Sequence, residues 1–365
     1  MAVLKRKAYY ISGFDDRGAE HYRAMYLSQC RKQSENATYS IQSDAIGEDA
    51  WRIQLTDTDQ KTSTLTDFRF IQWQHVMAPT MRENPVALWW HALEALTGYL
   101  TNGFLLRTRR TAPLFAFSIF LAMGWTLLTP LLAISLVVAI AAGWLPPVSG
   151  VLTGLGLGGL LWWIYKKFYP LLITRAFVFN GQAARNSDIL MSELKQQARL
   201  IAQDIEQGEA DEYLLIGHCY GSTLLPIILA ELASVIRSSK KTVSVLYLAQ
   251  TAPMLQWTSD WYPRQMRRVP FEALDCVDYS SPADGLCYPQ LESQDLDQNL
   301  DDQTCILKSP RFHTLFDADH YARIVRRNKF RIHFQYLLSS HKTDVYDYFY
   351  MTAGPMRLKD YALSR

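Results

Sequence analysis

The chain has 365 residues, enough for one large α/β domain with an insertion or for two ordinary domains. Its formal net charge of +2 gives no indication of a nucleic-acid partner, and 49% apolar residues suffice for a full core. Five scattered cysteines without a C-x-x-C pair argue against a disulfide framework and a zinc site, and they indicate a reducing compartment. We therefore expect neither a bound metal nor another cofactor.

Residues 1–84 are predicted to form the first part of an α/β domain. No secretory signal is apparent, because residues 1–7 lead directly into a short apolar strand. The alternation of apolar and polar residues predicts the other elements of this part. The predicted elements are a strand at 7–13, a helix at about 19–32, two strands within 37–56 and a strand at 67–76.

Residues 85–180 are predicted to be a membrane-associated insertion, organised around an uncharged tract. No charged residue occurs from Thr111 to Tyr165, and a bilayer core of about 30 Å needs about 20 apolar residues per helix. The tract therefore accommodates two transmembrane helices, at about 114–145 and 148–165. The alternative is a hydrophobic hairpin buried in a soluble core. An apolar helix over 85–106 precedes the tract and is expected at the membrane interface.

Basic residues flank the uncharged tract on both sides. Arg107, Arg109 and Arg110 precede it, and Lys166 and Lys167 follow it. By the positive-inside rule, both ends of the tract lie in the cytoplasm. We therefore expect an integral protein of the bacterial inner membrane, with both termini and the rest of the chain on the cytoplasmic side.

Residues 181–365 are predicted to complete the α/β domain, and they contain the strongest chemical signal. An apolar strand at 214–216 is followed by an apolar helix over 223–237. Between the two, Gly217-His-Cys-Tyr-Gly221 fits a turn of the form Gly-x-nucleophile-x-Gly. Such a turn strains the backbone of the nucleophile, and only residues without side-chain bulk fit beside it. The alternative is a buried cysteine packed in a glycine-containing turn.

With this turn between a strand and a helix, the sequence resembles the α/β-hydrolase family, with Cys219 where most members carry serine. The resemblance implies a mostly parallel sheet flanked by helices, interrupted here by a transmembrane hairpin. It covers roughly residues 7–80 and 185–330. Cysteine-bearing relatives include dienelactone hydrolases and polyhydroxyalkanoate synthases. The synthases have a G-x-C-x-G-G box, where this chain has Ser222, so we carry over the chemistry and not the polymer substrate.

The family's order of nucleophile, acid and histidine, each after a strand, guides the assignment of the other two residues. Predicted strands end near 248, 279 and 308. Asp284 follows the second of these and is the predicted acid, with a plain turn aspartate as its alternative. His313 follows the third and is the predicted histidine. Cys219, Asp284 and His313 are thus the predicted catalytic residues.

Other residues stay open as candidates for the acid and the histidine. Asp275 and Asp278 are weaker candidates for the acid because they lie within the predicted strand. His333 is the alternative histidine, although its surroundings indicate a position in the middle of a helix. His320 is expected to open a helix.

The resemblance also implies an oxyanion hole made of two backbone N–H groups. One belongs to Tyr220, directly after the nucleophile. The other belongs to the loop after the first strand, at Phe14 or Asp15. An ordinary turn with a helix N-cap at Asp15 or Asp16 is the alternative for this loop.

The sequence therefore predicts a membrane-anchored acyl hydrolase or acyltransferase of the esterase or thioesterase type. Its cysteine nucleophile would act on an acylated or lipid-like substrate at the cytoplasmic face, with the lipid bilayer as partner. The alternative is a non-catalytic, membrane-anchored binding module that retains the hydrolase fold. The oligomeric state stays open.

Overall fold

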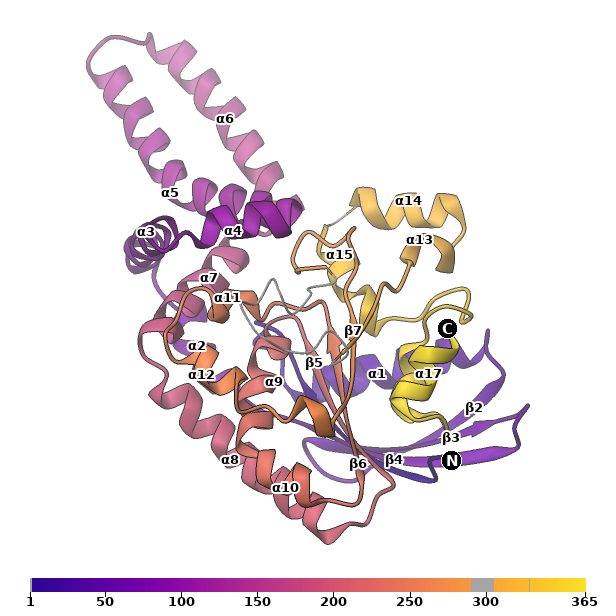
Figure 1. Cartoon of the computed structure of the whole chain (residues 1–365). Coiled ribbons are helices and arrows are strands. Elements are labelled where there is room, and N and C mark those ends of the chain that lie inside the picture. The colour runs from indigo at the N-terminus through magenta and orange to yellow at the C-terminus, as the bar shows by residue number, and fades with distance from the viewer. Residues whose placement is uncertain (1, 290–304, 328) are drawn as a thin grey trace.

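A computed structural model of the chain describes residues 2–289, 305–327 and 329–365 and contains one mixed β-sheet (Figure 1). In this described part the sheet has eight strands in the order β2-β3-β4-β1-β5-β6-β7-β8. β3 is antiparallel to β2 and β4, whereas all other neighbouring strands are parallel. The strands are β1 (Lys5–Ile11), β2 (Tyr39–Ala45), β3 (Ala50–Asp57), β4 (Thr62–Phe70), β5 (Glu212–His218), β6 (Thr242–Leu248), β7 (Asp275–Tyr279) and β8 (Ile306–Lys308).

Helices cover both faces of the sheet, so the predicted α/β class with a mostly parallel sheet is confirmed. The core on one face of the sheet includes buried residues of α2 (Gln74–Met81), α3 (Pro85–Thr101), α4 (Phe104–Thr111), α7 (Pro170–Arg185), α8 (Asp188–Gln207), α9 (Tyr220–Glu231), α10 (Ala233–Ser238), α11 (Pro253–Gln256) and α12 (Tyr262–Met266). The core on the other face includes buried residues of α1 (Ala19–Ser34), α13 (Phe312–Leu315), α14 (Ala318–Arg327), α15 (Lys329–Phe334), α16 (Tyr348–Ala353) and α17 (Leu358–Ser364).

The central strand β5 has every residue buried, which explains why its sequence does not alternate between apolar and polar residues. Tyr213 and Leu215 contribute to the core on one face, and Leu214 and Ile216 contribute to the core on the other. A strand buried on both faces holds its C-terminal end rigidly. The residue that follows β5 therefore has a fixed position at the edge of the sheet.

A buried ion pair attaches the C-terminal segment to the sheet. Arg6 Nη2 lies 2.6 Å from Glu212 Oε2, and neither side chain is exposed. The same guanidinium donates to the backbone oxygens of Gly354 and Met356, at 3.0 and 2.7 Å. The segment that leads from α16 to α17 is thereby held against β1 and β5.

Several predicted elements end at other residues than expected. The strand predicted at 67–76 ends at Phe70, and His75 lies in α2. The N-cap of α1 is Gly18, so neither Asp15 nor Asp16 caps this helix. The helix predicted over 85–106 is two helices, because Gly103 adopts a positive φ of 74° between α3 and α4.

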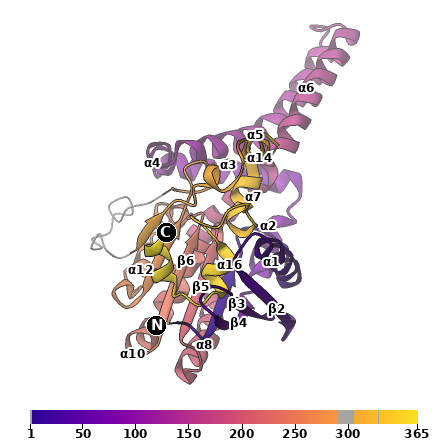
Figure 2. The same cartoon turned by 90° about the vertical axis from the view of Figure 1, so that its right-hand side faces the viewer.

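The uncharged tract forms a helical hairpin that projects from the α/β domain (Figures 1 and 2). Its helices are α5 (Pro113–Ala141) and α6 (Pro147–Phe168), where spans at about 114–145 and 148–165 were predicted. Both helices are long and apolar enough to cross a membrane.

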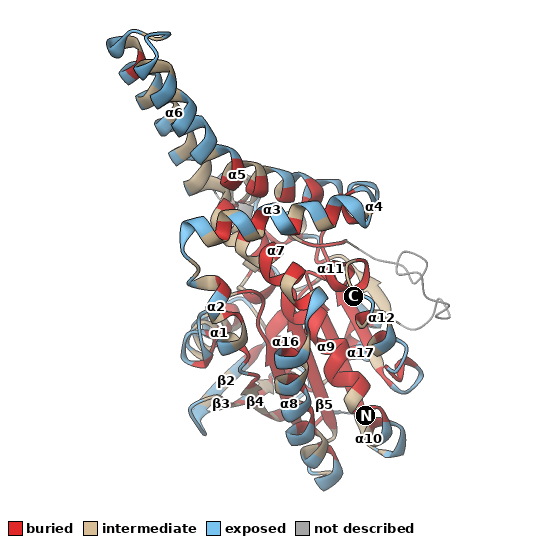
Figure 3. Ribbon diagram, turned by 90° about the vertical axis from the view of Figure 1, so that its left-hand side faces the viewer, coloured by how far each residue is buried: buried red, intermediate tan, exposed pale blue. Residues whose placement is uncertain are grey.

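The insertion is not a separate body, because part of it shares a core with the sheet. Phe115, Ile119 and Met123 of α5 are buried in the same cluster as Phe177 of α7 and the residues of β5. Beyond Leu127 no residue of α5 is buried, as the exposed hairpin in Figure 3 shows. The first half of α5 therefore belongs to the domain, and the second half with α6 forms the free hairpin.

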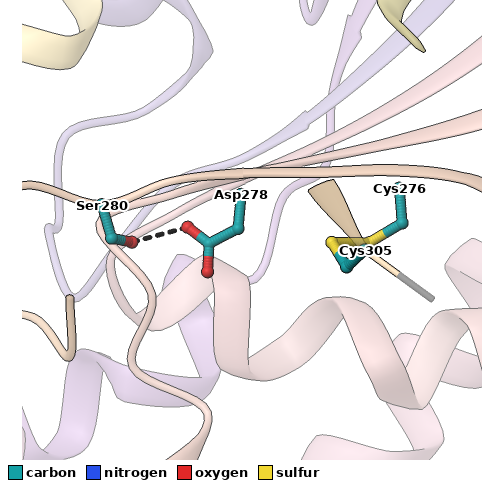
Figure 4. The surroundings of a disulfide bond; sticks show 4 residues. All are labelled: Cys276, Asp278, Ser280 and Cys305. Atoms are coloured by element: carbon teal, nitrogen blue, oxygen red, sulfur yellow. Dashed lines mark hydrogen bonds between the residues drawn. A yellow bond between two sulfur atoms is a disulfide. The ribbon is translucent and has the colours of Figure 1, made fainter. Parts of the chain in front are cut away.

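Two cysteines form a disulfide, contrary to what their scattered positions indicated. Cys276 of β7 is bonded to Cys305, which directly precedes β8 (Figure 4). The pairing of β7 with β8 brings together two residues that lie 29 positions apart in the sequence. Since disulfides are typical of oxidising compartments, this bond counts against the reducing compartment that the cysteine pattern indicated.

The orientation of the hairpin is open to a direct test. Because basic residues flank both ends of the uncharged tract, topology reporters fused at Pro147 and after Arg365 should report opposite sides, with the C-terminus cytoplasmic. Reporters on the same side would exclude a membrane-crossing hairpin. A C-terminal reporter on the oxidising side would reverse the orientation and agree with the disulfide.

Candidate active site

The residue with the most strained backbone among the candidates is Cys219, which connects β5 to α9. Its φ and ψ are 56° and −126°, a combination that side-chain-bearing residues avoid and that costs on the order of 1–3 kcal/mol. The Cys219 N–H donates to Leu248 O at 2.9 Å, and Cys219 O accepts from Thr251 Oγ1 at 2.7 Å. Neighbouring strand β6 and the loop after it therefore hold the turn in place.

Three glycines allow the close approach of backbone segments around Cys219. A Cβ at Gly221 would lie 2.3 Å from Ile11 O, and a Cβ at Gly217 would lie 2.8 Å from Gly221 O. A Cβ at Gly13 would lie 2.7 Å from the Cβ of Cys219. Because these contacts leave no room for a side chain, the glycines of the Gly-x-Cys-x-Gly pattern are required by packing.

Asp284 and His333 form a buried pair, and His333 faces the same cavity as Cys219. His333 Nδ1 lies 2.8 Å from Asp284 Oδ2, and both side chains are almost fully buried. Asp284 lies in the loop after β7, where its Oδ1 also accepts from Leu286 N at 3.0 Å. His333 comes from α15 and lines the cavity together with Cys219. The structure thus brings together the predicted nucleophile, the predicted acid and the alternative histidine.

His313 does not join these residues, and this corrects the sequence-based choice of histidine. It lies on the one-turn helix α13, is exposed, and does not line the cavity that contains Cys219. The neighbouring Phe312 takes the buried position of this helix and packs against Tyr336, so His313 faces away from the core. The histidine that meets the acid comes later in the chain, when α15 returns to the end of β5.

The pair has opposite shifts of its two pKa values. Burial by itself would lower the pKa of His333, but the charge of Asp284 and that of Cys219 outweigh it and raise this pKa well above 6.5. Burial would raise the pKa of Asp284, but the charge and hydrogen bond of His333 outweigh it and lower this pKa below 3.8. Within the described residues, the buried Nε2 of His333 forms no hydrogen bond of ordinary length, although the Cys219 side chain is close enough to contribute to the raised pKa of His333. This nitrogen is available to exchange a proton with Cys219.

His218 forms a hydrogen bond with the backbone of His333, a role that the sequence analysis did not predict. Its Nε2 lies 2.8 Å from His333 O, and since a carbonyl oxygen only accepts, this nitrogen carries the hydrogen. Burial and the charge of His333 lower the pKa of His218 to about 3, so its ring is neutral. The feature of the sequence that could have indicated this role is the position of His218 directly before Cys219 in the glycine-flanked turn.

The two residues expected to form the oxyanion hole lie at the cavity. Tyr220 is the first residue of α9, where backbone N–H groups have no partner within the helix. Phe14 lines the cavity and follows Gly13, where a side chain would collide with Cys219. The loop before Phe14 is fixed, because Trp73 Nε1 donates to Ser12 O at 3.1 Å. These positions fit two donors beside the Cys219 sulfur.

The charge of Asp15 beside this loop is balanced by Arg17. Arg17 Nη2 lies 2.5 Å from Asp15 Oδ2, and the Tyr22 hydroxyl donates to the same carboxylate at 2.8 Å. Burial would raise the pKa of Asp15, but these contacts lower it below 3.8. The negative charge of the carboxylate next to Phe14 is therefore compensated by its own partners.

The insertion contributes a buried asparagine that supports the nucleophile turn. Asn180 of α7 accepts from the Tyr220 hydroxyl at 3.2 Å and donates to Tyr99 Oη and Met254 O, at 3.1 and 3.2 Å. No pattern in the sequence connects residue 180 with residue 220. The contact arises only because α7 packs across α9 and α11.

The two weaker candidates for the acid have other partners. Asp278 accepts from Ser280 Oγ at 2.6 Å (Figure 4), and burial raises its pKa to about 7. Asp275 lies 3.5 Å from Lys359 Nζ at the opposite end of β7. Neither carboxylate contacts His333, so Asp284 is the acid that the geometry supports.

The site opens into a cavity of about 590 Å³, a size suited to a small ligand or to a hydrocarbon chain. The insertion contributes much of its apolar wall, with Phe115, Tyr169, Leu172, Ile173, Ala176 and Phe177. In the described ranges no three His, Cys, Asp or Glu side chains are grouped to hold a metal ion.

Comparisons with protein-family models, curated proteins and solved structures give no match to this chain.

The reactivity of Cys219 should depend on His333 and not on His313. Because only thiolate reacts with iodoacetamide, His333→Ala should slow labelling of Cys219 by about tenfold or more, whereas His313→Ala should leave it unchanged. Peptide mass spectrometry measures this rate, and the other two free cysteines, Cys30 and Cys287, are buried. Slower labelling in His313→Ala alone would restore His313 as the partner.

The buried pair should also produce a pH-dependent contribution to stability. The raised pKa of His333 gives stability that is complete below pH 6.5 and is lost as pH rises through the folded pKa. The lowered pKa of Asp284 gives stability that is complete above pH 3.8 and is lost at lower pH. Asp284→Asn should therefore cost most between these values, on the order of 3–5 kcal/mol.

Thermal unfolding in detergent, followed from acidic to alkaline pH, measures this difference. The loss in Asp284→Asn should shrink in alkaline solution, where His333 is neutral in both proteins. The matched substitution Asp278→Asn removes a buried carboxylate that does not contact His333. Because the folded pKa of Asp278 is about 7, its effect should change between pH 3.8 and about pH 7 and should stay constant in alkaline solution. A constant loss for Asp284→Asn across the whole range would contradict the ion pair.

Proposed function

We propose that this protein is a membrane-anchored acyl hydrolase or acyltransferase with Cys219 as its nucleophile. The observation that carries the proposal is that a strained, glycine-flanked cysteine and His333 line one largely apolar cavity, while the buried Asp284 bonds the other side of the His333 ring. Nucleophile, acid and histidine follow one another in the chain in the order used by α/β-hydrolases. The nucleophile also lies between a parallel strand and a helix, as in that fold, which we propose for the domain.

The proposed chemistry begins with transfer of the Cys219 proton to His333 Nε2. The sulfur attacks the acyl carbonyl carbon, and the N–H groups of Tyr220 and Phe14 stabilise the resulting oxyanion. Collapse breaks the bond to the leaving group, which takes the proton from His333. Asp284 keeps the His333 ring oriented through Nδ1 and stabilises its charged form.

The second half of the reaction regenerates the thiol. A water molecule, or an acceptor alcohol or amine, gives a proton to His333 Nε2 and attacks the thioester carbon. The carbon–sulfur bond breaks, the acid or the transferred acyl product leaves, and Cys219 recovers the proton. A thiolate is a good leaving group, so this site suits esters and thioesters better than amides.

The proposal also includes the way in which the protein is attached to the membrane. The uncharged hairpin would anchor the domain in the bilayer next to acylated or lipid-like substrates, and the basic flanks favour the cytoplasmic face. The Cys276–Cys305 disulfide is the observation that speaks for the opposite side. Neither orientation alters the chemistry at Cys219.

Substitution of the nucleophile tests the catalytic role. With a panel of acyl thioesters and activated esters, Cys219→Ser should lower turnover by about two orders of magnitude or more, because serine needs a stronger base. Cys219→Ala should form no acyl-enzyme, which intact-protein mass spectrometry detects. Cys30→Ala removes a buried cysteine remote from the cavity and serves as the control.

The same experiment separates the enzyme from the non-catalytic binding module. A binding module would bind acyl compounds equally in the wild-type protein and in Cys219→Ala, and neither would gain the mass of an acyl group. That result, with folded protein in both cases, would overturn the proposed activity.

A further inference from the structure

A second, smaller cavity lies between the membrane hairpin and the loop that carries the acid. Its volume is about 120 Å³. One wall is the first half of α5, and the opposite wall is the loop after β7, represented by Ala283, Gly285 and Leu286. The two walls are in direct contact, since a Cβ at Gly285 would lie 3.3 Å from Ser118 Oγ. The helix that enters the membrane thus packs against the neighbours of Asp284.

The smaller cavity adjoins the cavity of the active site. Ile173, Leu286 and Phe330 line both cavities and form the partition between them. Two of these residues lie close in sequence to a residue of the candidate site, and the third belongs to the insertion. Leu286 donates its N–H to Asp284, Phe330 precedes His333 on α15, and Ile173 lies on α7. All three side chains are apolar, so an acyl chain could pass between them without losing hydrogen bonds.

The exposed surface of α5 at this cavity is apolar. Leu114 and Phe117 line the smaller cavity and are exposed, and Phe120, one turn further along the helix, is also exposed; Phe117 exposes 59% of its surface. A solvated helix rarely presents such a face, whereas a helix in contact with lipid does. The smaller cavity therefore lies beside a surface that suits the bilayer.

The length of the free hairpin also indicates that the smaller cavity lies within the bilayer. The part of α5 beyond Leu127 is about 21 Å long, at about 1.5 Å per residue. A bilayer core is about 30 Å thick, so this part alone does not cross it. Crossing requires that the first half of α5, with its exposed apolar face, also enters the hydrocarbon region. The smaller cavity then lies at the depth of the acyl chains.

From these contacts we propose that the substrate is a long-chain acyl lipid whose chain reaches Cys219 sideways from the bilayer. The chain enters between α5 and the loop after β7, passes Ile173, Leu286 and Phe330, and presents its carbonyl carbon to the sulfur. This inference rests on the proposed acyl chemistry and adds the substrate class and its route. A soluble short-chain acyl compound would instead enter the larger cavity directly from water.

The test compares two acyl donors on the full chain reconstituted in phosphatidylcholine vesicles. One donor is a palmitoyl thioester inserted in the vesicles, and the other is the corresponding butanoyl thioester in water. Leu121→Trp fills the smaller cavity, and Leu128→Trp places the same side chain on the exposed part of the same helix. Mass spectrometry measures the rate at which Cys219 gains each acyl group.

The lateral route predicts a change in chain selectivity. Leu121→Trp should lower the ratio of palmitoyl to butanoyl transfer by about tenfold or more, because a displaced chain no longer presents its carbonyl correctly. Leu128→Trp should keep the wild-type ratio. In the wild-type protein, a photoreactive diazirine in the middle of the palmitoyl chain should cross-link to α5 or to residues 283–286, a readout that needs no variant.

The outcomes distinguish failure of the route from failure of the activity. Cys219 acylated by neither donor would overturn the proposed activity itself. Acylation by both donors, with the same selectivity in Leu121→Trp and Leu128→Trp, would overturn the lateral route alone. Cross-links confined to α1 or to the polar loop at residues 15–17 would likewise place the chain at the water-facing side and overturn it. Iodoacetamide labelling of Cys219 at the wild-type rate shows that each variant retains its site.

Discussion

The contact of Gly221 with the end of β1 is the constraint on which the geometry of the site depends. Any side chain at residue 221 would collide with the carbonyl oxygen of Ile11, and so the start of α9 could not approach β1. This approach brings Gly13 and Phe14 beside Cys219. It also forces Cys219 into its strained conformation, which directs the sulfur into the cavity. The strain is tolerated because β5 is buried on both faces.

The insertion that carries the apolar hairpin contributes directly to the candidate site. Asn180 anchors the Tyr220 side chain, and Phe115 and Phe177 line the cavity that contains Cys219. The first half of α5 is buried in the same core as the sheet. A movement of α5 would therefore also move the walls of the cavity.

The buried polar groups around the nucleophile form one connected set. Asp284 bonds His333, His333 O accepts from His218, and His218 directly precedes Cys219. Each member is held by another member or by the backbone, which compensates for the loss of water on burial. Within this set, the Nε2 of His333 and the Nδ1 of His218 form no hydrogen bond of ordinary length among the described residues. The Nε2 of His333 can therefore exchange a proton with the nearby thiol of Cys219.

The sequence by itself determined the α/β class, the apolar hairpin, the strained turn at Cys219 and the candidate acid, because these features depend on local patterns of apolar residues and glycines. Only the tertiary structure decided between His313 and His333, since Phe312 takes the buried position near β8 and the chain returns to β5 later. The Cys276–Cys305 bond depends in the same way on the pairing of β7 with β8. Contacts between residues far apart in the chain follow from packing, which no short pattern records.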